Sequence, residues 1–137
     1  MKRLKSESGF TMVELIIVVT IMGIIGAILV PQFSTVTQKA RITTDISSVK
    51  GIQRHIDRYK AEFGNYPGTT AEAIMEELVD KSYIDSIYIT VDNKLKVETP
   101  GAEMVFDTAS QRVKLKVSQA EYNLYLGQAE PLEWLVK

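Results

Sequence analysis

The sequence predicts an α+β protein built on one long N-terminal helix that is followed by a small antiparallel sheet. Three observations lead to this prediction. An apolar block, residues 10–30, contains a single charged side chain, Glu14. A helical apolar stripe continues beyond this block as far as Phe63. Short runs of alternating apolar and polar residues then follow within residues 87–117. A helix and a sheet that each carry one apolar face are expected to pack on one another.

The apolar block has the length of a membrane-spanning helix. At about 1.5 Å per residue, residues 10–30 span roughly 30 Å, which is the hydrocarbon thickness of a bilayer. Only a helix satisfies its own backbone in that environment. The nine residues before the block carry three basic side chains against one acidic side chain, Glu7. By the positive-inside rule, the block is expected to cross the cytoplasmic membrane once, with its N-terminus in the cytoplasm.

Two simpler interpretations of the N-terminus fit the residues less well. A secretory signal peptide has an apolar region of about 7–15 residues and a small-residue cleavage site, which residues 28–31 do not offer. A plain membrane anchor explains the length of the block but leaves Glu14 unexplained. A carboxylate inside an apolar segment costs about 2.5–3.5 kcal/mol on insertion scales, so such a residue usually has a partner.

The helical pattern continues past the membrane block as an amphipathic segment, residues 31–64. Gly64 followed by Pro67 predicts the end of the helix. Pro31 removes one backbone hydrogen bond and clashes with the preceding turn, so the stretch from Gly23 to Pro31 is expected to be weak. Apolar residues recur every three or four positions along the segment, and they are Phe33, Val36, Ala40, Thr43, Ile46, Val49, Ile52, Ile56, Tyr59 and Phe63.

The remaining residues, 65–137, predict a small α+β head. Thr69 with Glu72 has the spacing of a capping box, which would open a short helix that extends to about Val79. Alternation predicts a meander of three or four antiparallel strands whose apolar face packs on the helical stripe. The segment 120–137 fits either a strand or a short helix. The predicted strands are 87–91, 94–97, 104–106 and 112–117, with turns at Asp92-Asn93 and Pro100-Gly101.

Residues 5–14, Lys-Ser-Glu-Ser-Gly-Phe-Thr-Met-Val-Glu, resemble the class III signal of type IV prepilins and type II secretion pseudopilins. That signal is a short basic leader ending in glycine, followed by phenylalanine and, four residues later, by glutamate. The resemblance implies that a prepilin peptidase cleaves between Gly9 and Phe10 and then N-methylates Phe10. It also implies that Glu14 forms an assembly salt bridge with the Phe10 amine of an adjacent subunit. Because residues 10 and 14 lie one turn apart, the residues alone leave an intrachain pair open.

The resemblance extends to the helix and implies a division of the chain. Gly23 and Pro31 lie where pilins have a helix-weakening glycine and proline, so this segment is expected to melt during assembly. The implied pilin-like organisation is a leader (1–9), a transmembrane and polymerisation helix (10–30), an amphipathic half-helix (31–64) and a globular head (65–137).

The resemblance implies a structural role in a filament. The chain is expected to be held in membrane lipid, processed by prepilin peptidase, and polymerised with copies of itself by an inner-membrane assembly platform and its ATPase. The product would be a cell-surface pilus used for adhesion or motility. One alternative is the major pseudopilin of type II secretion, because Gly64 with Tyr66-Pro67 resembles that protein. The chain lacks the later Asp-Pro-Trp-Gly type motif and a calcium-ligating loop. Another alternative is a minor pilin that binds DNA or a surface.

Composition argues against several other classes of function. The 137 residues include no cysteine and one histidine, His55, so we expect no metal site and no cofactor. No nucleophile has a nearby base in any recognisable pattern, so we expect the chain not to be an enzyme. The formal net charge of −1 gives no basis for binding nucleic acid. The lysines of 94–97 and 112–117 are the only support for a basic patch.

Overall fold

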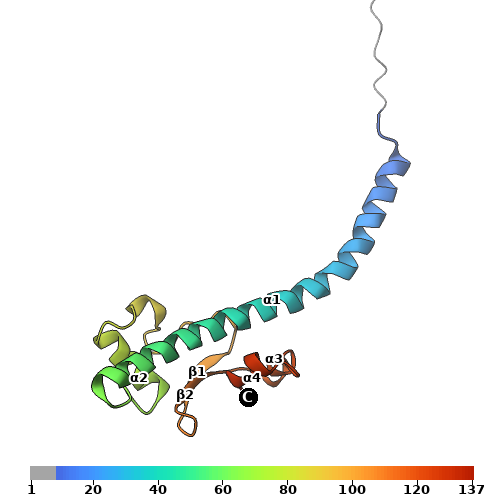
Figure 1. The fold of residues 1–137 in the computed structure, drawn as a ribbon. Coiled ribbons are helices and arrows are strands. Elements are labelled where there is room, and N and C mark those ends of the chain that lie inside the picture. Colours follow the sequence, from blue (N-terminus) through green and yellow to red (C-terminus); the bar gives the residue numbers. More distant parts are fainter. Residues whose placement is uncertain (1–8) are drawn as a thin grey trace, which may run out of the picture. The chain divides into compact units, whose positions relative to one another are not determined.

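The structure is a computed structural model that describes residues 9–137, so the predicted leader lies outside the described residues except for Gly9. It consists of two compact units, Met1–Thr37 and Gln38–Lys137. One long helix, α1 (Met12–Phe63), contributes to both units (Figure 1). The predicted boundaries at residues 30 and 64 stay a prediction.

The described part of the first unit is almost entirely the apolar half of α1. It is helical from Met12 onward, and the helix continues without interruption through Gly23 and Pro31. Within the described residues, α1 is the one helix that is long and apolar enough to cross a membrane, and none of its most apolar window is buried. The first unit therefore has the surface of a helix whose partners lie outside this chain.

The second half of α1 forms one wall of the head's core. The predicted apolar stripe is confirmed from Ile46 to Tyr59, but Ala40 and Thr43 are exposed. Ile42 and Asp45 are buried in their place. The Tyr125 hydroxyl forms hydrogen bonds with Thr43 Oγ1 and with the Lys39 carbonyl. The C-terminal segment that contains Tyr125 therefore covers this turn of α1, and its position decides which residues of the turn are buried. The buried residues of α1 are Ile42, Asp45, Ile46, Val49, Ile52, Gln53, Ile56 and Tyr59.

The short helix after α1 begins one residue later than the sequence pattern predicted. α1 ends at Phe63, and Gly64 follows with φ +78°, as expected of a helix C-terminus. The next helix, α2 (Ala71–Asp80), is capped by Thr70, whose hydroxyl accepts a hydrogen bond from the Ala73 amide at 3.2 Å. The predicted capping box of Thr69 with Glu72 is therefore wrong, because the residue three positions after the true cap is an alanine.

The first two predicted strands, 87–91 and 94–97, are absent from the described structure as strands. A short 3-10 helix, η1 (Ser86–Tyr88), replaces the first, and Ile89 forms an isolated bridge with Leu95. The Asp85 carboxylate accepts from the Ile87 amide at 3.0 Å and starts η1. The alternating pattern misled because Ile87 is exposed and covers no core. The predicted turn at Asp92-Asn93 is confirmed, with the Asn93 amide bonded to the Thr90 carbonyl at 3.1 Å.

The sheet has three strands and mixed topology rather than the predicted antiparallel meander. β1 (Glu103–Asp107) and β2 (Arg112–Lys116) are antiparallel, and they confirm the last two predicted strands. The third strand, β3 (Leu135–Val136), comes from the C-terminus and pairs parallel to β2, giving the order β1-β2-β3. Two short helices, α3 (Gln119–Asn123) and α4 (Ala129–Glu133), connect β2 to β3. The ambiguous tail thus contains both helix and strand.

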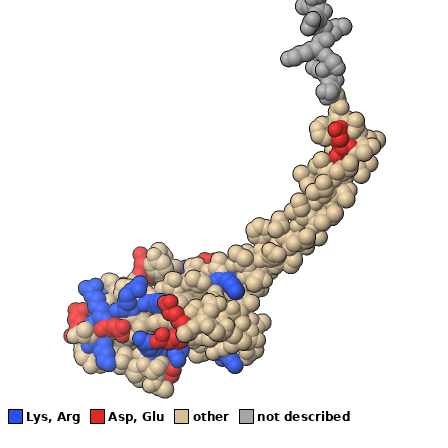
Figure 2. Space-filling model, turned by 45° about the vertical axis from the view of Figure 1, so that its right-hand side comes forward, with Lys and Arg blue, Asp and Glu red and all other residues tan. Residues whose placement is uncertain are grey.

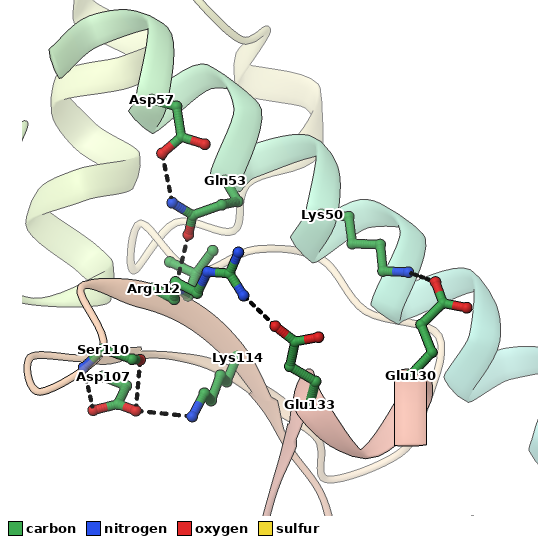
Figure 3. A network of polar contacts seen from close by, with 10 residues as sticks. Lys50, Gln53, Asp57, Asp107, Ser110, Arg112, Lys114, Glu130 and Glu133 are labelled. Carbon is green, nitrogen blue, oxygen red and sulfur yellow. Dashed lines mark hydrogen bonds and ion pairs between the residues drawn. The ribbon is translucent and has the colours of Figure 1, made fainter. Parts of the chain in front are cut away.

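Two buried polar side chains on α1 fasten the rest of the head to the helix. The Asp45 carboxylate is 1% exposed and accepts from the Glu98 amide at 2.7 Å and from the Thr99 amide at 2.8 Å. Gln53 accepts from the Val113 amide of β2 at 2.9 Å and donates to Asp57 at 2.9 Å (Figure 3). These bonds satisfy backbone donors that would otherwise be buried without a partner.

Gln53 accepts a hydrogen bond from the part of the β2 edge that β3 is too short to reach. On the side of β2 away from β1, the Leu115 amide donates to the Trp134 carbonyl at 2.8 Å and the Val117 amide to the Val136 carbonyl at 3.0 Å. The next donor along this edge is the Val113 amide, where Gln53 takes the place of a strand. A side chain of α1 therefore fixes the position of the sheet along the helix.

Ion pairs hold α4 and the β1–β2 hairpin (Figure 3). Lys50 on α1 pairs with Glu130 at 2.6 Å, and Arg112 on β2 pairs with Glu133. The Lys114 ammonium, 2.8 Å from Asp107, holds the pKa of that carboxyl well below its usual range. The hydrogen bond from Lys50 likewise lowers the pKa of Glu130. Because these two carboxyl groups have lower pKa values in the folded chain, they stabilise it at any pH above the usual carboxyl pKa values. The stabilisation is lost as the pH falls through the lowered pKa values.

We expect Asp45→Ala to destabilise the head, because it leaves the Glu98 and Thr99 amides without an acceptor. A buried unsatisfied donor costs about 1–3 kcal/mol. Chemical denaturation of the full chain in detergent micelles, followed by the fluorescence of Trp134, measures the loss. Asp92→Ala is the matched control, since Asp92 is exposed and lies outside the contacts of Asp45 and Gln53. Equal stability of the two variants would contradict the anchoring role of Asp45.

Candidate functional site

The predicted cleavage site lies in exposed, non-helical backbone just before α1. Gly9 and Phe10 precede the first helical residue, Met12, and Phe10 is 80% exposed. Nothing lies within 4 Å of the position that a Cβ on Gly9 would occupy. A protease binds its substrate as extended backbone that it reaches from several sides. The Gly9–Phe10 peptide bond meets this condition, whereas every peptide bond from Met12 to Phe63 lies within the helix.

Glu14 and Thr11 form a capping box at the N-terminus of α1. The Glu14 carboxylate accepts from the Thr11 amide at 2.8 Å and from the Thr11 hydroxyl at 2.7 Å. The Thr11 hydroxyl oxygen lies 3.2 Å from the Glu14 amide, from which it accepts. Two of the four amides that a helix start leaves unpaired are thereby satisfied.

Thr11 is a further residue of this site that was not predicted, although the sequence contains its signal. Thr11-Met12-Val13-Glu14 has the Ser/Thr-x-x-Glu spacing of a capping box, the same spacing that was applied to Thr69. The pattern was interpreted through Glu14 alone, as a charge that needs a partner. The structure adds that the carboxylate also has a neutral partner one turn earlier in its own chain.

The capping box leaves Glu14 able to bind a cation as well. A carboxylate has about four acceptor positions, and the two hydrogen bonds from Thr11 use one oxygen, Oε2. In the uncut chain the nitrogen of Phe10 is a peptide amide. Cleavage before Phe10 would turn it into a terminal amine, which is largely cationic at neutral pH. Thr11 therefore orients the Glu14 carboxylate without neutralising its charge.

Gly23 and Pro31 lie further along α1 and do not join this site. Gly23 is nine residues from Glu14, about 14 Å along the helix axis. No side chain lies within 4 Å of a Cβ placed on Gly23 or on Gly26. The structure therefore gathers Gly9, Phe10, Thr11 and Glu14 at one helix end, and it leaves the weak segment separate.

The lysine-bearing segments of the head do not form a free basic patch. Lys94 and Lys116 both lie near Glu103, at 3.7 and 3.3 Å, and Lys114 is paired with Asp107. The Lys96 ammonium donates to the Ile87 carbonyl at 2.6 Å. A phosphate backbone would therefore compete with existing partners at each lysine, which disfavours nucleic-acid binding on this surface.

A groove of about 350 Å³ lies between α1 and the segment 83–96 of the head. Its lining includes Gly51 and His55 of α1, together with Tyr88, Leu95 and Lys96. His55 is half-buried at this position. Among residues 9–137, no three histidine or acidic side chains gather in a way that could hold a metal ion.

Comparisons with known proteins point to one family. The prokaryotic N-terminal methylation motif matches residues 4–30. The chain is 36% identical over 77 residues to type II secretion system core protein G of Pseudomonas aeruginosa, which covers 56% of this chain and 53% of that protein. It is 31% identical over 93 residues to the protein of the same name from Aeromonas hydrophila, covering 62% and 64% of the two chains.

A relative with a different name matches about as much of the chain. The fimbrial protein of Neisseria meningitidis is 28% identical over 85 residues, covering 61% of this chain and 50% of that protein. No solved structure matches the chain significantly. The chain thus spans about half to two thirds of the length of these relatives. The methylation motif, these relatives and the long N-terminal helix followed by a small sheet agree, and the chain is therefore similar to type IV pilins and type II secretion pseudopilins.

Proposed function

We propose that this chain is a structural subunit of a type IV pilus-like filament. In this proposal a prepilin peptidase cleaves the Gly9–Phe10 bond and methylates the new amine of Phe10. The mature subunit then polymerises through the first half of α1, and it is neither an enzyme nor a carrier of a cofactor. The observation that carries the proposal is the helix terminus itself: an exposed peptide bond at Gly9, followed at once by a helix start that Thr11 and Glu14 cap with one oxygen of the Glu14 carboxylate.

The surface of the first unit supports polymerisation through the helix. Its large apolar side chains from Phe10 to Val30 are between 39% and 83% exposed. Figure 2 shows this part of the chain as an almost uncharged surface, with the charged side chains gathered over the second unit. An apolar surface of this extent is stable only in lipid or against similar helices. Lipid before assembly and other subunits after assembly are the two environments that the proposal provides.

The proposed partners and locations follow from these two environments. Before assembly the subunit crosses the cytoplasmic membrane once, with its N-terminus in the cytoplasm. Afterwards it is part of an extracellular filament built by an inner-membrane assembly platform and its ATPase. Glu14 is proposed to pair with the methylated Phe10 amine of an adjacent subunit. Both charges are costly alone in hydrocarbon, so the pair would set the axial register of each incoming subunit.

A second candidate function is that of the major pseudopilin of a type II secretion system. The observation in its favour is that two of the relatives described above carry the name type II secretion system core protein G, at 36% and 31% identity. In that case the same assembly would give a short periplasmic filament that acts in protein export. Electron microscopy of sheared surface material separates the two functions, because long surface filaments support the pilus and their absence alongside an export defect supports the pseudopilin.

Processing predicts a defined N-terminus. Mass spectrometry of the mature subunit should find a chain that begins at Phe10 and carries one added methyl group. Gly9→Val should leave the leader attached, because a branched side chain then occupies the position before the scissile bond. Gly101→Asn is the control, because nothing lies within 4 Å of a Cβ at that position. Gly68→Ala would not serve, because a Cβ there would meet Ala73 and Ile74 at 3.0 Å. A mature chain that still begins at Met1 would contradict the proposal.

Glu14 variants separate the assembly charge from the helix cap. Glu14→Gln retains an acceptor at the third position of the capping box but loses the charge, whereas Glu14→Ala loses both. We expect both variants to be inserted and cleaved and neither to form filaments, which sheared-fraction immunoblots and electron microscopy measure. If Glu14→Gln assembled normally and Glu14→Ala did not, the cap rather than the charge would be the essential property.

The segment from Gly23 to Pro31 is proposed to unwind during assembly. It is helical in the isolated chain. Extended backbone rises about 3.3 Å per residue against 1.5 Å in a helix, so melting would lengthen the subunit. Density from a cryo-electron microscopy map of the filament should show non-helical backbone between these residues. A continuous helix there would contradict this part of the proposal, and Pro31→Ala should then leave filament assembly unchanged.

A further inference from the structure

The side of α1 that borders the groove contains a half-buried glycine, Gly51, that no contact within the chain requires. Gly51 lies in the interior of α1, where glycine is less stable than alanine. A Cβ at this position would meet only the Arg54 guanidinium, 3.8 Å away. Gly51 also lines the groove beside the segment 83–96. A helix-interior glycine with open space above it favours close approach by another molecule.

Two arginines of α1 lie on the same side of the helix as this glycine. Arg54 lies over it, Arg58 follows one turn later with its guanidinium 5.5 Å from the Tyr83 ring, and His55 lines the groove. Within the described residues, neither arginine has a carboxylate oxygen inside the 4.0 Å of an ion pair. The one acidic residue of the groove lining, Asp85, accepts from the Ile87 amide. We call Gly51, Arg54, His55 and Arg58 the basic face of α1.

The same head carries an acidic surface on α2. α2 has four acidic residues and no basic residue, and Ile74, Met75 and Leu78 of this helix face the core. Glu72, Glu76 and Asp80 recur every four residues and are exposed. Among residues 9–137, Glu72 and Glu76 take part in no ion pair, and Asp80 has only Lys81 at 3.6 Å. We call Glu72, Glu76 and Asp80 the acidic face of α2.

Symmetry requires two different faces on each subunit of a filament. A contact between identical patches closes a dimer, whereas an open helical assembly needs a patch that binds a different patch on the next copy. The basic face of α1 and the acidic face of α2 are opposite in charge, and both are present once on every copy. Electrostatic complementarity of this kind selects the partner and fixes its register.

We infer that the basic face of α1 binds the acidic face of α2 of a second copy of this chain. Arg54 and Arg58 receive the carboxylates of Glu72 and Glu76, and the absence of a side chain at Gly51 lets the partner's helix approach. The inference rests on the proposed filament and adds to it a head-to-head contact, in addition to packing of the apolar helix halves.

Charge reversal in the full-length chain, expressed in its own host, tests the contact. Arg54→Glu with Arg58→Glu, and separately Glu72→Lys with Glu76→Lys, should each lower the yield of sheared filaments about tenfold or more, since like charges then face each other. The chain that carries all four substitutions should recover to within about twofold of the wild type. Glu98→Lys is the control, because Glu98 is exposed and lies outside both faces.

Gly51→Leu gives an independent test, since it should fold and be processed normally but lower the filament yield. Thermal unfolding of each purified full chain in detergent separates loss of assembly from loss of folding. Normal filament yield from the charge-reversed pairs, or no recovery when the two pairs are combined, would overturn the inference while leaving the proposed function intact. A wild-type chain that forms no filament would overturn the proposed function and this inference with it.

Discussion

The head depends on burial of one stripe of α1. Ile46, Val49 and Ile56 form a wall on which α2, the sheet and the C-terminal segment pack. Two polar side chains lie within the same stripe, and each has a defined bond: Asp45 binds the loop before β1, and Gln53 binds β2. Apolar contacts hold the sheet against the helix with little preference for its position along the axis. The two polar bonds supply that preference, because a shift in either direction would leave buried amides without acceptors.

The two halves of α1 are both helical but differ in which of their sides are apolar. The first half is apolar on all sides and carries one charged group, whereas the second half is apolar on one side only. Glu14 is the exception in the first half, and its capping box with Thr11 reduces the cost of that exception by giving the carboxylate two donors. In the proposed function, processing and polymerisation are two steps of one chemical event, since cleavage would create the amine with which Glu14 is proposed to pair.

The charged side chains on the surface of the head differ from one helix or strand to the next in whether they have a partner in the same chain. The lysines near the sheet have acceptors in their own chain, while, among residues 9–137, Arg54, Arg58, Glu72 and Glu76 of the two faces form no ion pair. This distribution argues for recognition of another copy rather than of an anionic polymer. It also explains why net charge is uninformative here, because opposite charges on separate faces cancel in the sum while remaining available to a partner.

Local sequence patterns were enough to predict a long apolar helix, its end before Gly64 and the β1–β2 hairpin, all of which the structure contains, and they also predict a processing signal at Gly9-Phe10. Each of these depends on local patterns: apolar length, the Gly9-Phe10 signal, the stop at Gly64 and the alternation in residues 104–117. Only the tertiary structure decided that residues 87–97 form a 3-10 turn and a bridge, that β3 joins β2 in parallel, and that Ile42 and Asp45 rather than Thr43 face the core. These outcomes depend on which surfaces are covered by segments distant in the chain, and periodicity carries no information about that covering.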